Sequence, residues 1–164
     1  MSTTGQQAQS AGSGISSEAL LRHWQGHRGL TRRVIEAFPE DELFSFSIGG
    51  MRPFGVLAME MISMAVPTLE GVVTDEWDSS SDRSARAKEE VLRIWDANTR
   101  QIDELWPRIT PERFQETVTA FGQWPGPVYD LILYVIDNEI HHRGQGYVYL
   151  RALGNEPPPF YERG

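Results

Sequence analysis

The sequence predicts an all-α protein, built as a four-helix bundle. Three observations support this prediction. Apolar residues recur at three- and four-residue spacing in four long segments, which is the pattern of amphipathic helices. Capping residues, prolines and glycines fall at the ends of these segments. No internal repeat or long linker divides the 164 residues, so the four helices are expected to pack around one core.

The first helix is expected from about Glu18 to Phe38. Ser16 and Ser17 provide an N-cap, and Glu18 suits the positive end of the helix dipole. Pro39 ends the segment. The residues that share one face at the helical spacing are Leu20, Trp24, His27, Leu30, Val34 and Phe38.

The second helix is expected to begin at Pro53, because the missing N–H of a proline costs nothing in a first turn. Gly49 and Gly50 punctuate the connection that precedes it. Pro67 is expected to kink the helix, which then resumes to about Val73.

The third helix is expected from about Asp82 to Trp106, with Pro107 closing it. A less regular stretch follows, in which Val118 to Phe121 is a candidate extended piece. The fourth helix is expected from about Pro127 to Leu153, and Gly154 provides its C-terminal stop.

The amino-acid composition limits the number of domains and the classes of partner that the protein can have. Residues 1–16 are polar and rich in Gly, Ser, Gln and Thr, so we expect a disordered segment there and one domain over 17–164. The net charge of −8 argues against nucleic acid and anionic membrane surfaces as partners. We expect no membrane span, because no apolar run approaches the roughly 20 residues that one requires. A cytoplasmic protein is the expectation.

Candidate chemistry concentrates in "NEIHHRGQ", residues 138–145. Asn138 and His142 are four apart and share a helix face otherwise made for the core. Gln145 and Tyr149 continue that face. In the second helix, Glu60 lies on or beside the apolar stripe, where a carboxylate is costly unless it is paired, protonated or bound to a cation.

Each of these residues also has an interpretation without function. His142 could be a core histidine satisfied by one hydrogen bond, and Glu60 could pair with Arg52 or Arg143. Glu139 and Arg143 are four apart and are expected to form a solvated ion pair.

His23 and His27 form a second pair of histidines four residues apart. Their spacing would suit a metal, but Trp24 beside them favours packing. The sequence has no cysteine, so any metal site must use His, carboxylate or amide ligands.

"HHRGQ" near the end of the last helix, followed by "YLRALG" and a proline-rich tail, resembles the DinB family of bacterial four-helix proteins, the DinB/YfiT-like metalloenzymes. "MRPFGVLAMEM" resembles the start of that family's second helix. In the family, three histidines commonly hold a divalent metal, one from the second helix and two from the last helix. Carried over by motif, the ligand positions are Glu60, Asn138 and His142.

Two functions follow from this resemblance. In the first, the chain is a metal-dependent enzyme, of thiol-transferase or hydrolase type, with one Zn, Ni, Mn or Fe ion and a low-molecular-weight thiol as substrate. Glu60, Asn138 and His142 would then form a degenerate metal site, with Gln145 or Tyr149 contacting substrate. In the second, the protein is a metal-free, non-catalytic stress-response or ligand-binding protein, of the DNA-damage-inducible kind. A homodimer is expected in either case.

Overall fold

The computed structural model describes residues 14–163. The predicted disordered segment 1–16 therefore lies largely outside the described residues. Helices make up 62% of residues 14–163, and this described part also contains a short two-stranded hairpin. The protein is thus mostly helical as predicted, but not strictly all-α.

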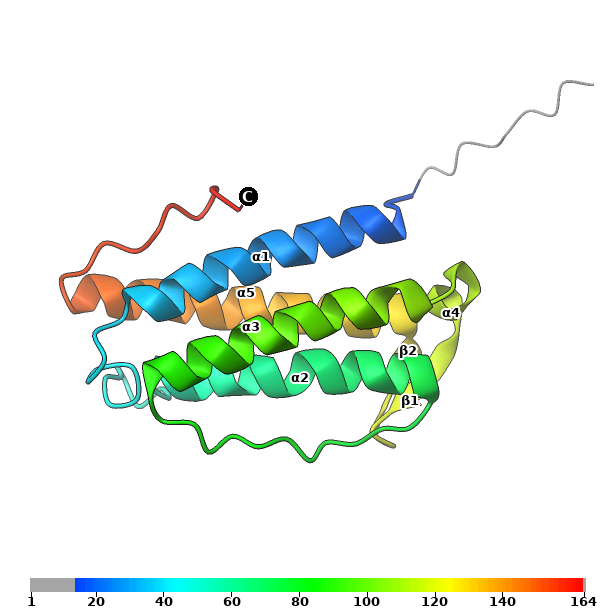
Figure 1. Cartoon of the computed structure of the whole chain (residues 1–164), viewed down its shortest axis with the longest axis horizontal. Coiled ribbons are helices and arrows are strands. Elements are labelled where there is room, and N and C mark those ends of the chain that lie inside the picture. Colours follow the sequence, from blue (N-terminus) through cyan, green and yellow to red (C-terminus); the bar gives the residue numbers. More distant parts are fainter. Residues whose placement is uncertain (1–13, 164) are drawn as a thin grey trace, which may run out of the picture.

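Four long helices dominate the structure: α1 (Ser17–Ala37), α2 (Phe54–Thr74), α3 (Lys88–Leu105) and α5 (Val128–Ala152). Figure 1 shows them side by side along the long axis of the molecule, with α1 and α5 running in one direction and α2 and α3 in the other. The parallel pair α2 and α3 requires a long crossover, which the segment 75–87 provides along the edge of α2.

The remaining elements lie together at one end of the helices (Figure 1). They are a single 3₁₀ turn, η1 (Trp106–Arg108), a short helix, α4 (Pro111–Gln115), and the antiparallel strands β1 (Thr117–Ala120) and β2 (Trp124–Pro127). The hairpin agrees with the extended piece expected near residue 118. Since β2 leads directly into α5, the hairpin is held against the first turns of that helix.

The predicted ends of α1, α2 and α5 are close to those observed. Ser16 caps α1 by accepting a hydrogen bond from the backbone N–H of Ala19, at 3.1 Å. Gly154 follows α5 with φ +79°, a left-handed conformation that glycine adopts without a Cβ penalty. Helix α2 continues through Pro67 to Thr74.

The predicted start of the third helix was wrong. α3 begins at Lys88, six residues after the expected Asp82. In the preceding segment, Asp82 accepts a hydrogen bond from the backbone N–H of Ser84. Such a short side-chain-to-backbone bond stabilises a turn in competition with helix.

Helix α2 is the most buried helix and forms the centre of the core. It contacts both α3 and α5 extensively. By length and composition it could cross a membrane, contrary to the expectation that no apolar run is long enough, but 67% of its most apolar window is buried inside the protein. The apolar character of α2 is therefore explained by its central position.

Candidate functional site in the seam between α2 and α5

The antiparallel packing of α2 and α5 brings Glu60 and His142 together. His142 Nε2 lies 3.0 Å from Glu60 Oε1, and the His142 side chain is almost completely buried. The two residues are 82 positions apart in the sequence. The resemblance to the DinB ligand positions implied that the two residues converge, and this contact forms the centre of the candidate site.

Arg52, just before α2, supplies the second partner of Glu60. Its guanidinium donates to Glu60 Oε2, while its backbone carbonyl accepts a hydrogen bond from the Tyr149 hydroxyl at 3.1 Å. Both oxygens of Glu60 are thus engaged, one by Arg52 and one by His142. The pairing with Arg52 is one of the two arginine pairings that the sequence left open.

The protonation of Glu60 follows from these contacts. Burial by itself would raise the pKa of Glu60, but the hydrogen bonds from Arg52 and His142 outweigh it and hold the pKa below its ordinary value. Glu60 is therefore a carboxylate at neutral pH, and its charge is balanced by Arg52.

Asn138 lies one helical turn before His142 and makes no side-chain hydrogen bond within residues 14–163. Its Oδ1 is buried and has no partner, and the same is true of His142 Nδ1. A buried acceptor without a donor costs about 1–3 kcal/mol, so such atoms call for a water, an ion or a ligand. The structure therefore brings Glu60 and His142 into contact. Asn138 lies beside them, but its side chain has no hydrogen-bond partner among the described residues.

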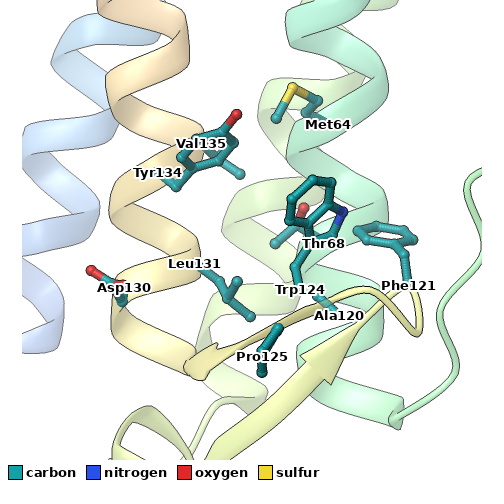
Figure 2. A pocket seen from close by; sticks show the side chains of 10 residues that line it. All are labelled: Met64, Thr68, Ala120, Phe121, Trp124, Pro125, Asp130, Leu131, Tyr134 and Val135. Carbon is teal, nitrogen blue, oxygen red and sulfur yellow. The ribbon is translucent and has the colours of Figure 1, made fainter.

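A cavity of about 380 Å³ continues the same seam between α2, the hairpin and α5. Figure 2 shows Met64 and Thr68 on α2 facing Leu131 and Val135 on α5, with Trp124 projecting from the hairpin. Met64 lies one turn beyond Glu60, and Val135 lies about one turn before Asn138. The cavity and the polar cluster are therefore neighbours along both helices.

Two aromatic side chains at this cavity are unusually exposed. Trp124 is 61% exposed and Tyr134 is 63% exposed. Phe121, which also lines the cavity, has φ +52°, a conformation that a bulky residue rarely adopts. Gly122 beside it has φ +67°, so the two residues form the tight turn between β1 and β2. Sequence reasoning missed the hairpin residues, although "FGQWPGP" combines turn residues with two aromatics.

Gln145 and Tyr149, the two predicted substrate-binding residues, lie outside the cavity. Tyr149 is fully buried, with its hydroxyl committed to the Arg52 carbonyl, and its ring packs against Phe46. Gln145 Nε2 lies 3.1 Å from His141 Nε2. Neither residue lines the cavity, and their role in substrate binding stays a prediction.

The expected solvated pair of Glu139 and Arg143 is wrong, because both side chains are buried. Glu139 accepts hydrogen bonds from Thr31 Oγ1 at 2.7 Å and from the Trp24 indole at 3.3 Å, and lies 3.7 Å from the Arg28 guanidinium. The error arose because a four-residue spacing of opposite charges is also compatible with each residue facing another helix.

Of the second pair of histidines, His27 is buried beside Arg143, whereas His23 is exposed. Their Nε2 atoms lie 3.2 Å apart, and Arg143 Nη2 lies 2.9 Å from His27 Nδ1. With a guanidinium on one ring nitrogen of His27, the pair is poorly suited to a metal, which supports the packing interpretation.

The residues at the family's metal positions do not fit a tight metal site. Glu60 and His142 are good ligands, but Asn138 offers only a neutral amide oxygen. Arg52 already balances the Glu60 carboxylate and would have to leave before a cation could bind there. No group of three or more His, Cys, Asp or Glu residues suited to a metal occurs among residues 14–163.

Comparison with known proteins agrees with the overall fold. The sequence matches the DinB family over residues 1–164. A crystal structure of a DinB-like protein from Bacillus subtilis superposes with a TM-score of 0.73 at 18% identity, covering 88% of this chain and 97% of that one.

A crystal structure of a DinB-like protein from Bacillus cereus gives a TM-score of 0.72 at 19% identity, with the same coverage. At these identities the two likenesses establish the fold alone. Among curated proteins, none matches the sequence significantly. On the family match across its whole length, the chain belongs to the DinB family.

Proposed function

We propose that this protein binds a small molecule in the seam between α2 and α5 without the help of a metal. The apolar body of the ligand occupies the cavity beside Met64, Leu131 and Val135. Its polar end reaches the cluster of Glu60, Asn138 and His142. The observation that carries the proposal is the position of this cavity beside a buried polar cluster. In that cluster Asn138 Oδ1 and His142 Nδ1 have no hydrogen-bond partner among the described residues.

The size and lining of the cavity support a small, largely apolar ligand. A volume of about 380 Å³ falls within the usual range of roughly 300–1,000 Å³ for ligand sites. The exposed rings of Trp124 and Tyr134 provide flat surfaces against which a planar ligand can stack.

The polar end of the site favours a ligand that donates hydrogen bonds. When His142 donates its Nε2 proton to Glu60, its Nδ1 is an acceptor, as is Asn138 Oδ1. A ligand with an O–H or N–H group would satisfy either atom, and a hydrophobic isostere without that group would leave it unsatisfied.

The neutral fluorescent probe N-phenyl-1-naphthylamine tests this proposal. Leu131→Trp fills the cavity and should abolish saturable probe binding. Leu133→Trp makes the same change two residues along α5, outside the cavity, and should leave binding unchanged. Equal binding by the two variants, or no saturable binding by the wild type, would overturn the proposal.

A second candidate keeps the family chemistry: a metal-dependent enzyme, of thiol-transferase or hydrolase type, acting on a low-molecular-weight thiol. It is supported by the position of Asn138 Oδ1, a buried oxygen beside the Glu60–His142 pair that a cation could also engage. Elemental analysis of untagged protein separates the candidates, because stoichiometric Zn, Ni, Mn or Fe would favour the enzyme.

The proposal also covers the cellular location and the oligomeric state of the protein. We place it in the cytoplasm as a homodimer of DinB-type four-helix bundles with a role in the stress response. Light scattering coupled to size exclusion would give twice the chain mass of 18.6 kDa if the dimer forms.

A further inference from the structure

The C-terminal segment, residues 155–163, returns along α5 and α1 (Figure 1). The Tyr147 hydroxyl of α5 donates to the Pro158 carbonyl at 2.7 Å, and Arg33 of α1 donates to the Glu162 carbonyl. These contacts hold the segment over the helices. Between the segment and α5 lies a second cavity, of about 550 Å³.

Basic side chains converge on this cavity in a protein with a net charge of −8. Arg143 and Arg151 of α5 line it. Arg33 and Arg163 do not line it but lie nearby, since Arg33 donates to the Glu162 carbonyl and Arg163 Nη1 lies 3.1 Å from His27 Nε2. Glu156 is the one carboxylate that lines the cavity within the described chain. Among the side chains that line the cavity, two arginines therefore stand against one carboxylate.

Arg143 has donors left for a ligand. Its Nη1 donates to the carbonyl of His27 and to Thr31 Oγ1, and its Nη2 lies 2.9 Å from His27 Nδ1. Its Nε–H has no acceptor among residues 14–163. A guanidinium edge with a free Nε–H has the geometry that binds a carboxylate or phosphate.

The charge of Arg143 is also incompletely balanced. Arg28 and Arg143 are both buried, and Glu139 is the nearest buried carboxylate for both. Keeping the charge of Arg143 in the interior is costly, because its side chain is almost completely buried. A bound anion would offset this cost.

We propose that the cavity beneath the C-terminal segment binds a small organic oxyanion, a carboxylate or a phosphate ester. The anionic group contacts the Nε edge of Arg143 and the guanidinium of Arg151. The apolar part of the ligand lies against a wall made by Ile140, Pro157, Pro159 and Phe160. Ile140 and Gly144 lie on the opposite side of α5 from Asn138 and His142, so this site is separate from the seam.

Calorimetric titration with phenyl phosphate and with inorganic phosphate, at low ionic strength in a chloride buffer, tests the proposal. The wild type should bind phenyl phosphate one to one, and benzyl alcohol should not bind. Arg151→Gln should weaken binding about tenfold. Arg100→Gln, the same change at an exposed position on α3, should have no effect.

A second variant distinguishes the effect of the positive charge of Arg143 from the effect of its guanidinium shape. Arg143→Lys keeps the positive charge but removes the Nε edge, and it should also weaken binding while far-UV circular dichroism stays unchanged. The proposal would be overturned if the wild type gave no saturable heat at millimolar phenyl phosphate. Equal weakening by Arg151→Gln and Arg100→Gln would overturn it too, because that result indicates general charge screening.

Discussion

At the scale of single residues, the contrast between Glu60 and Glu139 is instructive. Both carboxylates lie on faces that pack against other helices, yet only Glu60 was predicted to face inward. Glu60 stands between apolar residues in "VLAMEMISMA", so its burial is visible in the sequence. Glu139 stands beside charged and polar neighbours, and its burial depends on Trp24, Arg28 and Thr31 of α1.

The buried position of Glu139 leads to a prediction about stability. Glu139→Gln keeps the size of the side chain but removes the charge that stabilises the buried guanidiniums of Arg28 and Arg143. Breaking a buried ion pair in this way costs about 3–5 kcal/mol. Urea unfolding should therefore show a loss in that range, whereas Glu104→Gln at an exposed position on α3 should change stability by less than about 0.5 kcal/mol.

The polar part of the candidate site could be predicted from residues, and its apolar part could not. Glu60 and His142 were identified because polar groups on apolar faces are few, and the resemblance to the DinB ligand positions implied that they meet. The cavity was missed because its residues are ordinary core and hairpin side chains. Its existence depends on how closely the hairpin packs against α2 and α5, which no local pattern specifies.

At the scale of elements, the approach of α2 to α5 controls the seam. Gly146 allows this approach, because a Cβ at that position would lie 2.5 Å from the ring of Phe54. Gly144, half a turn away, has nothing within 4 Å of its would-be Cβ. These two glycines on one helix provide a matched pair of substitutions.

Gly146→Ala should destabilise the protein by about 1–3 kcal/mol, because the added methyl forces the Phe54 ring or the helix to move. Gly144→Ala should instead stabilise it by up to about 1 kcal/mol, through the higher helix propensity of alanine. Thermal unfolding of both variants measures the difference. If both substitutions stabilised the protein, or both destabilised it, the contact between α2 and α5 would be less close than described.

The helices differ in how well the sequence predicted them. The ends of α1 and α5 have clear local signals, Ser16 and Gly154, and both agreed with the structure. The start of α3 has no comparable signal, since Ala87 precedes it without a side-chain cap. Long-range contacts define that end instead: the Glu40 carboxylate accepts from the backbone N–H of Lys88, and the Lys88 ammonium donates to the Phe38 carbonyl.

At the scale of the whole molecule, the buried cluster between α1 and α5 makes stability depend on pH. Burial, then the charge of Arg143, and then His23 and Arg163 lower the pKa of His27 from 6.5 to about 4. The unfolded chain takes up a proton at His27 below about pH 6.5, while the folded chain does not until about pH 4. The free energy of unfolding should therefore fall as the pH is lowered through this window.

His27→Gln should flatten this part of the pH dependence, because glutamine can still accept a hydrogen bond from Arg143 but does not titrate. His141→Gln, at an exposed position on α5, should leave the slope as in the wild type. Urea unfolding at several pH values across the window between the two pKa values of His27 makes the comparison. Identical slopes for the wild type and His27→Gln would show that His27 is not held neutral in the fold.

The central claim is that the metal positions of this DinB-family chain have become a metal-free cluster, in which Arg52 replaces the positive charge of a cation beside Glu60. Calorimetric titration with Zn²⁺ tests it most directly, with Asn138→His as the informative variant and Asn155→His as its control. We expect no saturable one-to-one uptake by the wild type or the control. Asn138→His should gain a site, because the introduced imidazole and His142 can chelate from one helix face with Glu60 opposite. Tight one-to-one binding by the wild type, or no gain on Asn138→His, would contradict the account.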